Sequence, residues 1–292
     1  MKDELIGFSP AMRHAIGAAV DVASAPTTVL LTGETGSGKE VLARFIHQMS
    51  ARASLPVSVL SGTSLDLEQV ETALKHGGTV VLDEIAAIPM DTQGRLLTML
   101  EGAHASRVIA TSHRDLRELV ERGQLRSDLY YRLDVYPIVL PPLRERREDI
   151  GALADVLLAR IATSLGRAPV KLTGEAMGLL ESQRWPGNVR ELANVLERAS
   201  IRARGPIIEA TDLGLVTRPT DTSSFPAYLP LDLVQLERIA IAEALRRTNG
   251  NRTHAARLLN IGLRTLRQKL NAPSISSQDA VAPLEAMSAV AP

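Results

Sequence analysis

Short apolar runs alternate with amphipathic stretches over the first half of the chain. Each run is rich in β-branched residues and leads into a segment with the 3.6-residue apolar period of a helix. The five runs are Val29–Leu31, Val57–Leu60, Val80–Leu82, Val108–Ala110 and Ile138–Leu140. Continuous apolar strands separated by helices predict an α/β fold, with a parallel sheet covered by helices on both faces.

The pattern changes after Pro141 and Pro142. From residue 150 onward only helical spacing is found, with Ala and Leu at i, i+3 and i+4, which predicts a small helical subdomain. A later stretch rich in Thr, Ser and Pro predicts a linker, and a final Ala/Ser/Pro-rich stretch predicts a disordered tail. The predicted parts are an α/β subdomain at 1–149, a helical lid at 150–215, a linker at 216–230, a second helical domain at 231–271 and a tail at 272–292.

Charge is balanced over the whole chain but not along it. The sequence has 33 Lys and Arg against 33 Asp and Glu, which excludes a uniformly basic nucleic-acid coat. Residues 236–270 include eight Lys and Arg and two Glu, which gives a net charge of 8 − 2 = +6, so the rest of the chain carries −6. This asymmetry predicts a nucleic-acid-binding module joined to a domain of another function.

Composition limits the function classes further. The chain has no Cys, which excludes disulfides, thiolate zinc sites and a cysteine nucleophile and fits a reducing cytoplasm. Aromatic residues make up 3%, too few for a platform that stacks single-stranded bases. The N-terminal residues are acidic where a secretory signal is basic, and no apolar run approaches the roughly 20 residues that span a bilayer. We therefore predict a cytoplasmic protein with no membrane partner.

A phosphate-binding loop is predicted after the first strand. Residues 33–39, Gly-Glu-Thr-Gly-Ser-Gly-Lys, fit the pattern G-x-x-x-x-G-K between a predicted strand and a predicted helix at 40–49. This arrangement directs backbone N–H groups and a helix N-terminus at a phosphate, and it directs the lysine at the outer phosphates. An ordinary glycine-rich turn is the alternative interpretation. The predicted ATP contacts are Gly33, Glu34, Thr35, Gly36, Ser37, Gly38, Lys39 and Glu40.

Two acids end the third apolar run. Asp83 and Glu84 would lie at the carboxyl edge of the sheet, where open α/β folds bind ligands. Asp83 suits Mg²⁺, and Glu84 suits the orientation or deprotonation of an attacking water. Two solvated acids capping a strand would explain this motif alone, but both motifs in this order favour nucleotide hydrolysis.

The basic C-terminal part has the pattern of a helix-turn-helix. Two short helices are predicted around a turn at 260–262, packing on a helix at 233–247 through Ala256, Leu259, Ile261, Leu266 and Leu270. A plain basic amphipathic helix is the alternative. The predicted contacts with double-stranded DNA are Arg252, Arg257 and Lys269 on phosphates, and Arg264, Thr265, Arg267 and Gln268 on the outward face of the second helix.

Together these segments resemble a known family. Residues 5–12, 33–40, 77–85, 125–146 and 185–192 are similar to the AAA+ domain of bacterial enhancer-binding proteins, the ATP-dependent activators of sigma-54 RNA polymerase. Residues 249–270 resemble the Fis-type helix-turn-helix of the same family. The resemblance implies a AAA+ P-loop domain with a helical lid, assembly into a homo- or hetero-oligomeric ring, and RNA polymerase holoenzyme as a partner.

The resemblance also implies roles for single residues. Arg126 and Arg132 match the arginine fingers that reach the γ-phosphate of a neighbouring subunit, although without the resemblance the sequence favours surface salt bridges with Asp128 or Asp134. Arg190 matches the second sensor, with a pair to Glu191 or Glu197 as the alternative. Ser112 and His113 stand where the first sensor lies.

Three departures from the family bear on mechanism. The hexapeptide GAFTGA, with which the family contacts sigma-54, is absent, and only one helix, at about 65–75, fits between the second and third strands. Ser61 stands where an Asn normally pairs with the catalytic Glu. Because only four residues precede Leu5, no sensory domain is expected.

We therefore expect a DNA-binding transcription regulator with an ATPase domain, which works with a loop-bearing relative or on another polymerase form. One alternative is a DNA-bound scaffold or antagonist that ATP assembles without being hydrolysed. Another is a AAA+ replication initiator or helicase loader, which the segments at 185–192 and 140–146 disfavour.

Overall fold

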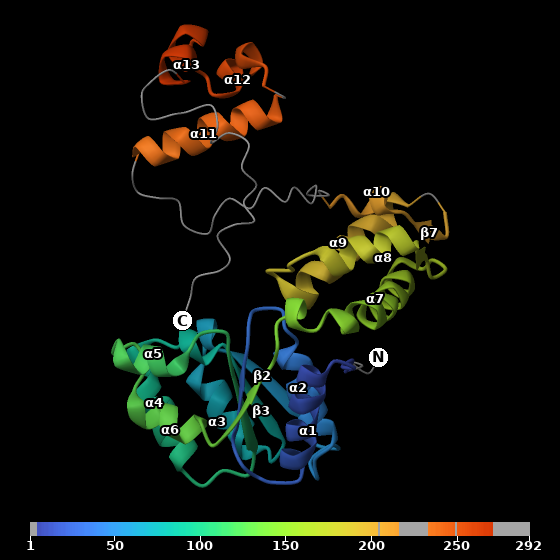
Figure 1. Cartoon of the computed structure of the whole chain (residues 1–292). Coiled ribbons are helices and arrows are strands. Elements are labelled where there is room, and N and C mark those ends of the chain that lie inside the picture. The colour runs from blue at the N-terminus through green and yellow to red at the C-terminus, as the bar shows by residue number, and fades with distance from the viewer. Residues whose placement is uncertain (1–4, 204, 216–232, 249, 271–292) are drawn as a thin grey trace. The chain divides into compact units, whose positions relative to one another are not determined.

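The computed structural model describes residues 5–203, 205–215, 233–248 and 250–270. The predicted linker at 216–230 and tail at 272–292 lie outside the described residues. The chain divides into two compact units, residues 1–217 and 218–292 (Figure 1).

The first unit is built around a parallel sheet of five strands in the order β2-β3-β4-β1-β5, which confirms the predicted α/β class. Every predicted run overlaps a strand. The strands are β1 (Val29–Thr32), β2 (Val57–Ser61), β3 (Thr79–Asp83), β4 (Arg107–Ser112) and β5 (Tyr136–Val139). Because β4 lies between β3 and β1, the segments that follow these three strands meet at one edge of the sheet.

Helices cover both faces of this sheet, as predicted (Figure 1). One face carries α1 (Pro10–Ala23) and α2 (Lys39–Gln48), and the other carries α3 (Leu67–Lys75), α4 (Met90–Glu101), α5 (Leu116–Glu121) and α6 (Ser127–Leu133). Successive residues of a strand point to opposite faces, so Leu30 joins one core while Val29 and Leu31 join the other.

A buried arginine fixes the end of α1. Arg107, 1% exposed at the start of β4, donates hydrogen bonds to the carbonyls of Ala23 (2.8 Å) and Val22 (2.7 Å). The last turn of any helix leaves its carbonyls without partners inside the helix. Here Arg107 satisfies that of Ala23 and shares that of Val22 with the backbone N–H of Ala25, at 3.1 Å. Burial lowers the pKa of Arg107 to about 10, a value at which the guanidinium stays charged at neutral pH.

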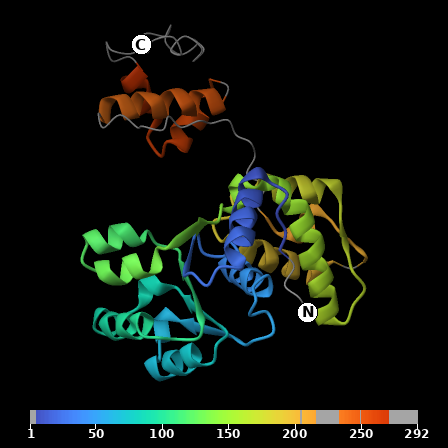
Figure 2. The same ribbon diagram turned by 90° about the horizontal axis from the view of Figure 1, so that it is seen from below.

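The lid is not entirely helical, contrary to the prediction. It contains α7 (Ile150–Leu165), α8 (Gly174–Ser182), α9 (Asn188–Arg202) and α10 (Ala210–Leu213), which pack around the buried Trp185 and appear in green to orange in Figure 2. Two short parallel strands, β6 (Lys171–Leu172) and β7 (Ile207–Ile208), tie the segment before α8 to the segment after α9. Strands of two residues are too short to show an alternating apolar pattern.

The described residues of the second unit form three helices, α11 (Leu233–Arg247), α12 (Arg252–Leu258) and α13 (Leu263–Leu270). Its core is formed by Ile241, Ala244, Ala255, Ala256 and Leu266, and Leu259, Ile261 and Leu270 pack against it, as the sequence predicts. Asn251 caps α12 by accepting from two backbone N–H groups at 3.1 and 3.2 Å. Asn260 turns the chain between α12 and α13 with a positive φ of 54°. Within the described part of the chain, no helix is both long and apolar enough to cross a membrane.

Candidate nucleotide site and DNA-binding surface

The loop between β1 and α2 needs glycine for its path. Gly33, Gly36 and Gly38 have φ values of 149°, 76° and 105°. A Cβ atom on Gly36 would lie 2.3 Å from the carbonyl oxygen of Gly187, and one on Gly33 would lie 2.7 Å from that of Leu140. The backbone of the loop therefore reaches its neighbours as only glycine allows.

Lys39 opens α2 and is buried, with 6% of its side chain exposed. Its ammonium donates to the carbonyls of Gly33 (2.9 Å) and Glu34 (3.3 Å) and lies 3.5 Å from Oε1 of Glu84. The buried hydroxyl of Ser37 has no hydrogen-bond partner among the described residues. A left-handed glycine loop, an ammonium and a free hydroxyl at a helix N-terminus together fit a bound phosphate group.

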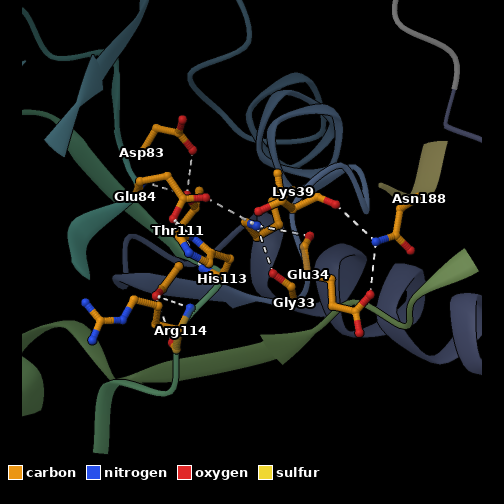
Figure 3. Close-up of polar contacts among 11 residues, drawn as sticks. Gly33, Glu34, Lys39, Asp83, Glu84, Thr111, His113, Arg114 and Asn188 are labelled. Atoms are coloured by element: carbon orange, nitrogen blue, oxygen red, sulfur yellow. Dashed lines mark hydrogen bonds and ion pairs between the residues drawn. The ribbon is translucent and has the colours of Figure 1, made fainter. Parts of the chain in front are cut away.

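The two acids lie at the end of β3 and are held by β4 (Figure 3). Thr111 donates its hydroxyl hydrogen to Oδ1 of Asp83 at 2.6 Å, and the same hydroxyl oxygen accepts from the backbone N–H of Glu84 at 3.1 Å. Glu84 has a positive φ of 56°, a strained conformation for a residue with a side chain. One threonine thus orients both acidic residues.

Glu84 is also held from the end of β4 by His113. Its Oε2 contacts Nδ1 of His113 and accepts from the backbone N–H of that residue at 3.3 Å. Burial opposes ionisation of Glu84, but the hydrogen bond from His113 and the charge of Lys39 outweigh it and lower the pKa of the carboxyl. The carboxylate is therefore ionised and fixed beside the loop.

The predicted arginine fingers are both engaged within the chain. Arg126 forms a two-pronged bond to Asp128 (3.1 and 2.8 Å), which is the alternative considered from the sequence. Arg132 donates to the carbonyl of Leu100 at 3.1 Å. The structure does not bring either arginine to the loop of its own subunit.

Arg190 and Glu40 differ in their placement. Arg190 is exposed on α9, but its Cβ lies 3.1 Å from the position of a Cβ built on Gly36, so the lid brings it beside the loop. Glu40, on the exposed side of α2, bonds to Arg44 four residues on, at 2.8 Å. Of the predicted set, the structure thus brings the loop, Lys39, Asp83, Glu84 and Arg190 together, whereas Glu40, Arg126 and Arg132 are engaged elsewhere in the chain.

The segment between β2 and β3 is short. Residues 62–78 hold one 3-10 turn, Gly62–Ser64, and one helix, α3, which agrees with the single helix expected there. Ser61 ends β2 beside Asp83 in the sheet register, and its hydroxyl bonds to that of Thr63 at 2.8 Å rather than to Glu84. His113 occupies the side-chain contact on Glu84 instead.

Sequence reasoning missed two residues of the site, Asn188 and Arg144. Asn188 is fully buried with a positive φ of 53°, and its amide donates to Oε2 of Glu34 at 3.1 Å (Figure 3). Arg144 binds the same carboxylate through two nitrogens, at 2.8 and 2.7 Å. Both lie in segments that carry the family resemblance, but no local pattern marks them as partners of a residue more than 100 positions away.

The candidate DNA-binding residues lie on α12 and α13. Six of the seven predicted side chains are exposed, namely Arg252, Arg257, Arg264, Thr265, Arg267 and Gln268. Lys269 is the exception, because its ammonium forms an ion pair with Glu237 of α11.

Known proteins share this architecture. A P-loop sheet with a helical lid and a helix-turn-helix defines a AAA+ regulator, and three family models divide the chain accordingly. They are the sigma-54 interaction domain at residues 6–143, the AAA+ ATPase lid domain at 144–227 and the bacterial regulatory protein, Fis family, at 233–272.

Full-length relatives extend this match. The transcriptional regulatory protein ZraR of Salmonella typhi is 38% identical over 91% of this chain and 68% of its own length, and the regulatory protein AtoC of Escherichia coli K12 is 35% identical over 93% and 68%. The chain therefore belongs to the family of sigma-54-type AAA+ transcription regulators, the bacterial enhancer-binding proteins.

Solved structures agree with this assignment. NtrX of Brucella abortus, crystallised in complex with ATP, matches with a TM-score of 0.67 and 30% identity over 91% of this chain and 69% of that chain. RuvB of Thermotoga maritima shares the fold alone. It is 17% identical, the match covers 91% of this chain and 87% of that chain, and the TM-score is 0.52.

Proposed function

We propose that this chain is a cytoplasmic, DNA-binding transcription regulator that hydrolyses ATP between the subunits of a ring. The observation that carries the proposal is the cluster of Lys39, Glu84 and Asp83 beyond the carboxyl ends of β1 and β3, with 3.5 Å between Lys39 Nζ and Glu84 Oε1. The same chain carries a helix-turn-helix whose outward arginines are exposed.

Each residue of the cluster has a distinct role in this proposal. The loop at 33–38 and Lys39 hold the phosphates of ATP, and Asp83, oriented by Thr111, holds Mg²⁺. When bound, Mg²⁺ neutralises charge on the phosphate oxygens. Glu84, ionised and fixed by His113, orients a water molecule and takes its proton.

The short segment between β2 and β3 determines how the regulator would act on transcription. Residues 62–78 have no GAFTGA sequence and hold only α3 and a turn. We propose that contact with sigma-54 polymerase is made by a loop-bearing relative in a mixed ring, or that the chain acts on another polymerase form.

One observation favours a second candidate function. Since Ser61 bonds to Thr63, no amide from β2 reaches Glu84 to report the state of the nucleotide. The chain would then be a DNA-bound scaffold or antagonist that ATP assembles without turnover. Membership of the sigma-54-type family removes the reason to consider a replication initiator or helicase loader.

The ATPase proposal is tested by turnover of the full chain at concentrations where it assembles. Asp83→Ala is expected to lower turnover by roughly 100-fold or more, because the metal-dependent charge stabilisation is lost. Asp91→Ala, which removes an exposed acid from α4, is the control and should keep wild-type turnover. Turnover that Asp83→Ala leaves intact contradicts hydrolysis at this site, and equal assembly with ADP and ATP without turnover selects the scaffold.

The transcriptional role is tested on a sigma-54 promoter. The chain alone is expected to give no transcription. With a loop-bearing relative added, transcription is expected, and its level should change when the Asp83→Ala variant replaces the wild-type chain in the mixture. Activation by this chain alone would show that the missing loop does not matter.

A further inference from the structure

Three consecutive carbonyls of the phosphate loop accept hydrogen bonds from outside the loop. Thr35 accepts from Nδ2 of Asn188 (3.0 Å), Gly36 from the backbone N–H of Val189 (3.0 Å), and Ser37 from Nη2 of Arg146 (2.5 Å). Asn188 and Val189 begin α9 of the lid, and Arg146 belongs to the hinge, residues 140–149, which joins the sheet to the lid. The lid and hinge thus hold the loop along its length.

Asn188 joins three segments at once. Besides Thr35, its Nδ2 donates to Oε2 of Glu34, and its Oδ1 accepts from the backbone N–H of Leu143 in the hinge at 2.7 Å. The side chain is fully buried, so an unmade bond here would leave a polar group without water. Its positive φ suits Asn, which visits the left-handed region more easily than other residues with a side chain.

Arg144 adds a charged link between the hinge and the loop. Its two guanidinium nitrogens bind the two carboxylate oxygens of Glu34 in a fork, a strong and directional geometry. Gly36 permits the close approach of the lid, because a Cβ there would lie 2.3 Å from the carbonyl oxygen of Gly187. The contacts therefore depend on the lid lying directly against the loop.

These bonds have a consequence for the opposite side of the loop. In a planar trans peptide the C=O and N–H groups point in opposite directions. A carbonyl held towards the lid or hinge therefore fixes the next N–H group away from it. The three N–H groups concerned are those of Gly36, Ser37 and Gly38. That of Ser37 donates to the carbonyl of Glu34 within the loop at 3.2 Å, which leaves those of Gly36 and Gly38 to face a phosphate. Oriented N–H groups are what a phosphate-binding loop contributes, so the lid and hinge determine whether these donors are arranged in advance.

We infer that Asn188, Arg144 and Arg146 are positioning residues that hold the loop in its phosphate-binding conformation, so that lid docking and phosphate binding are coupled. The inference rests on the proposed function only for the identity of the ligand, ATP. Coupling is reciprocal: the lid contacts raise the population of the competent loop, and a ligand that needs that loop tightens the lid contacts.

Hydrogen–deuterium exchange of the full chain without nucleotide tests the contact directly. Arg144→Ala removes an exposed side chain, and Asn188→Gly keeps access to positive φ, so both changes spare the backbone. Both variants are expected to exchange faster than wild type in peptides covering 33–39 and 186–192. Arg147→Ala, an exposed arginine in the same hinge, is the matched control and should exchange like wild type. Unchanged exchange in both segments of both variants overturns the inference.

Equilibrium binding of a fluorescent ATP analogue tests the coupling. The two variants are expected to bind about tenfold more weakly, as they would if about a tenth of the loops were competent, and Arg147→Ala should bind like wild type. ATP should also slow exchange in 186–192 of the wild type. Weaker binding with unchanged exchange overturns the inference, since the loss would then come from a direct contact. A wild type that binds no ATP contradicts the proposed function, and the exchange comparison still decides the role of the lid.

Discussion

Glu34 belongs to the phosphate loop by sequence, yet its carboxylate bonds to the hinge and lid. Hydrogen bonds from Arg144 and then from Asn188 lower the pKa of Glu34 below its ordinary value of 4.5. A carboxyl whose pKa is lowered by folding stabilises the folded state above its unfolded pKa, and this contribution is lost as the pH falls through the folded pKa. Stability of the first unit should therefore depend on this pair at neutral pH and not in acid.

Urea unfolding of wild type and Arg144→Ala measures this dependence. The pair is partly exposed, so the variant should be only slightly less stable than wild type at about pH 7. The difference should shrink as the pH falls below about 4.5 and continue to shrink as the pH passes through the lowered pKa of the folded state. A difference that stays constant over this range would show that Arg144 stabilises the fold by packing alone.

Individual residues of the site differ in how far the sequence predicts them. Lys39, Asp83 and Glu84 follow from local motifs, because their neighbours in the chain define the strand, loop and helix that place them. Asn188 and Arg144 could not be predicted in this way. Their partner Glu34 is 154 and 110 positions distant, and the positive φ of Asn188 has no signature in its neighbours.

At the scale of elements, the three predicted phosphate contacts differ in their surroundings. Arg252 and Arg257 of α12 are exposed, whereas Lys269 of α13 is paired with Glu237 of α11. Each phosphate contact contributes about one to the slope of log K against log salt. Arg252→Ala and Arg257→Ala should each reduce the slope by about one, and Lys269→Ala should change the slope less than either. Fluorescence anisotropy with a random-sequence duplex measures the slopes, and equal changes in all three variants would contradict the ion pair.

Elements were predictable where burial imposes a pattern. Parallel strands buried on both faces read as continuous apolar runs, which is why all five strands of the large sheet were found. The pair β6 and β7 has only two residues in each strand and left no pattern. Helix starts are set by local caps such as Asp66 and Asp115, and boundaries predicted from periodicity alone miss them by one or two residues.

At the scale of the whole molecule, the neutral total hides an uneven distribution of charge. The segment from 236 to 270 carries +6 and the remainder of the chain −6. Attraction to the DNA backbone is therefore concentrated in the helix-turn-helix, which leaves the nucleotide unit available for the contacts between subunits that the proposed ring requires. Arg126 fits such a contact, since it is exposed and held only by Asp128 of its own chain.

Mixed assemblies test whether the site is completed by a neighbour. Glu84→Gln removes the proposed catalytic carboxylate, keeps the size of the side chain and retains Arg126, the proposed finger. Arg126→Ala removes the proposed finger and retains the site. Each variant alone should turn over little ATP. In an equimolar mixture about a quarter of the interfaces would combine an intact site with an intact finger, so about a quarter of wild-type turnover should return.

Two controls make this mixing experiment decisive. Arg122→Ala, which removes another exposed arginine of the same region, should be active alone. Energy transfer between fluorescent labels of different colour on the two variants establishes that they share rings, since separate rings would recover nothing. Shared rings without recovered turnover would place the action of Arg126 within its own subunit. Recovery near a quarter requires two chains at each site, because neither variant contains both groups.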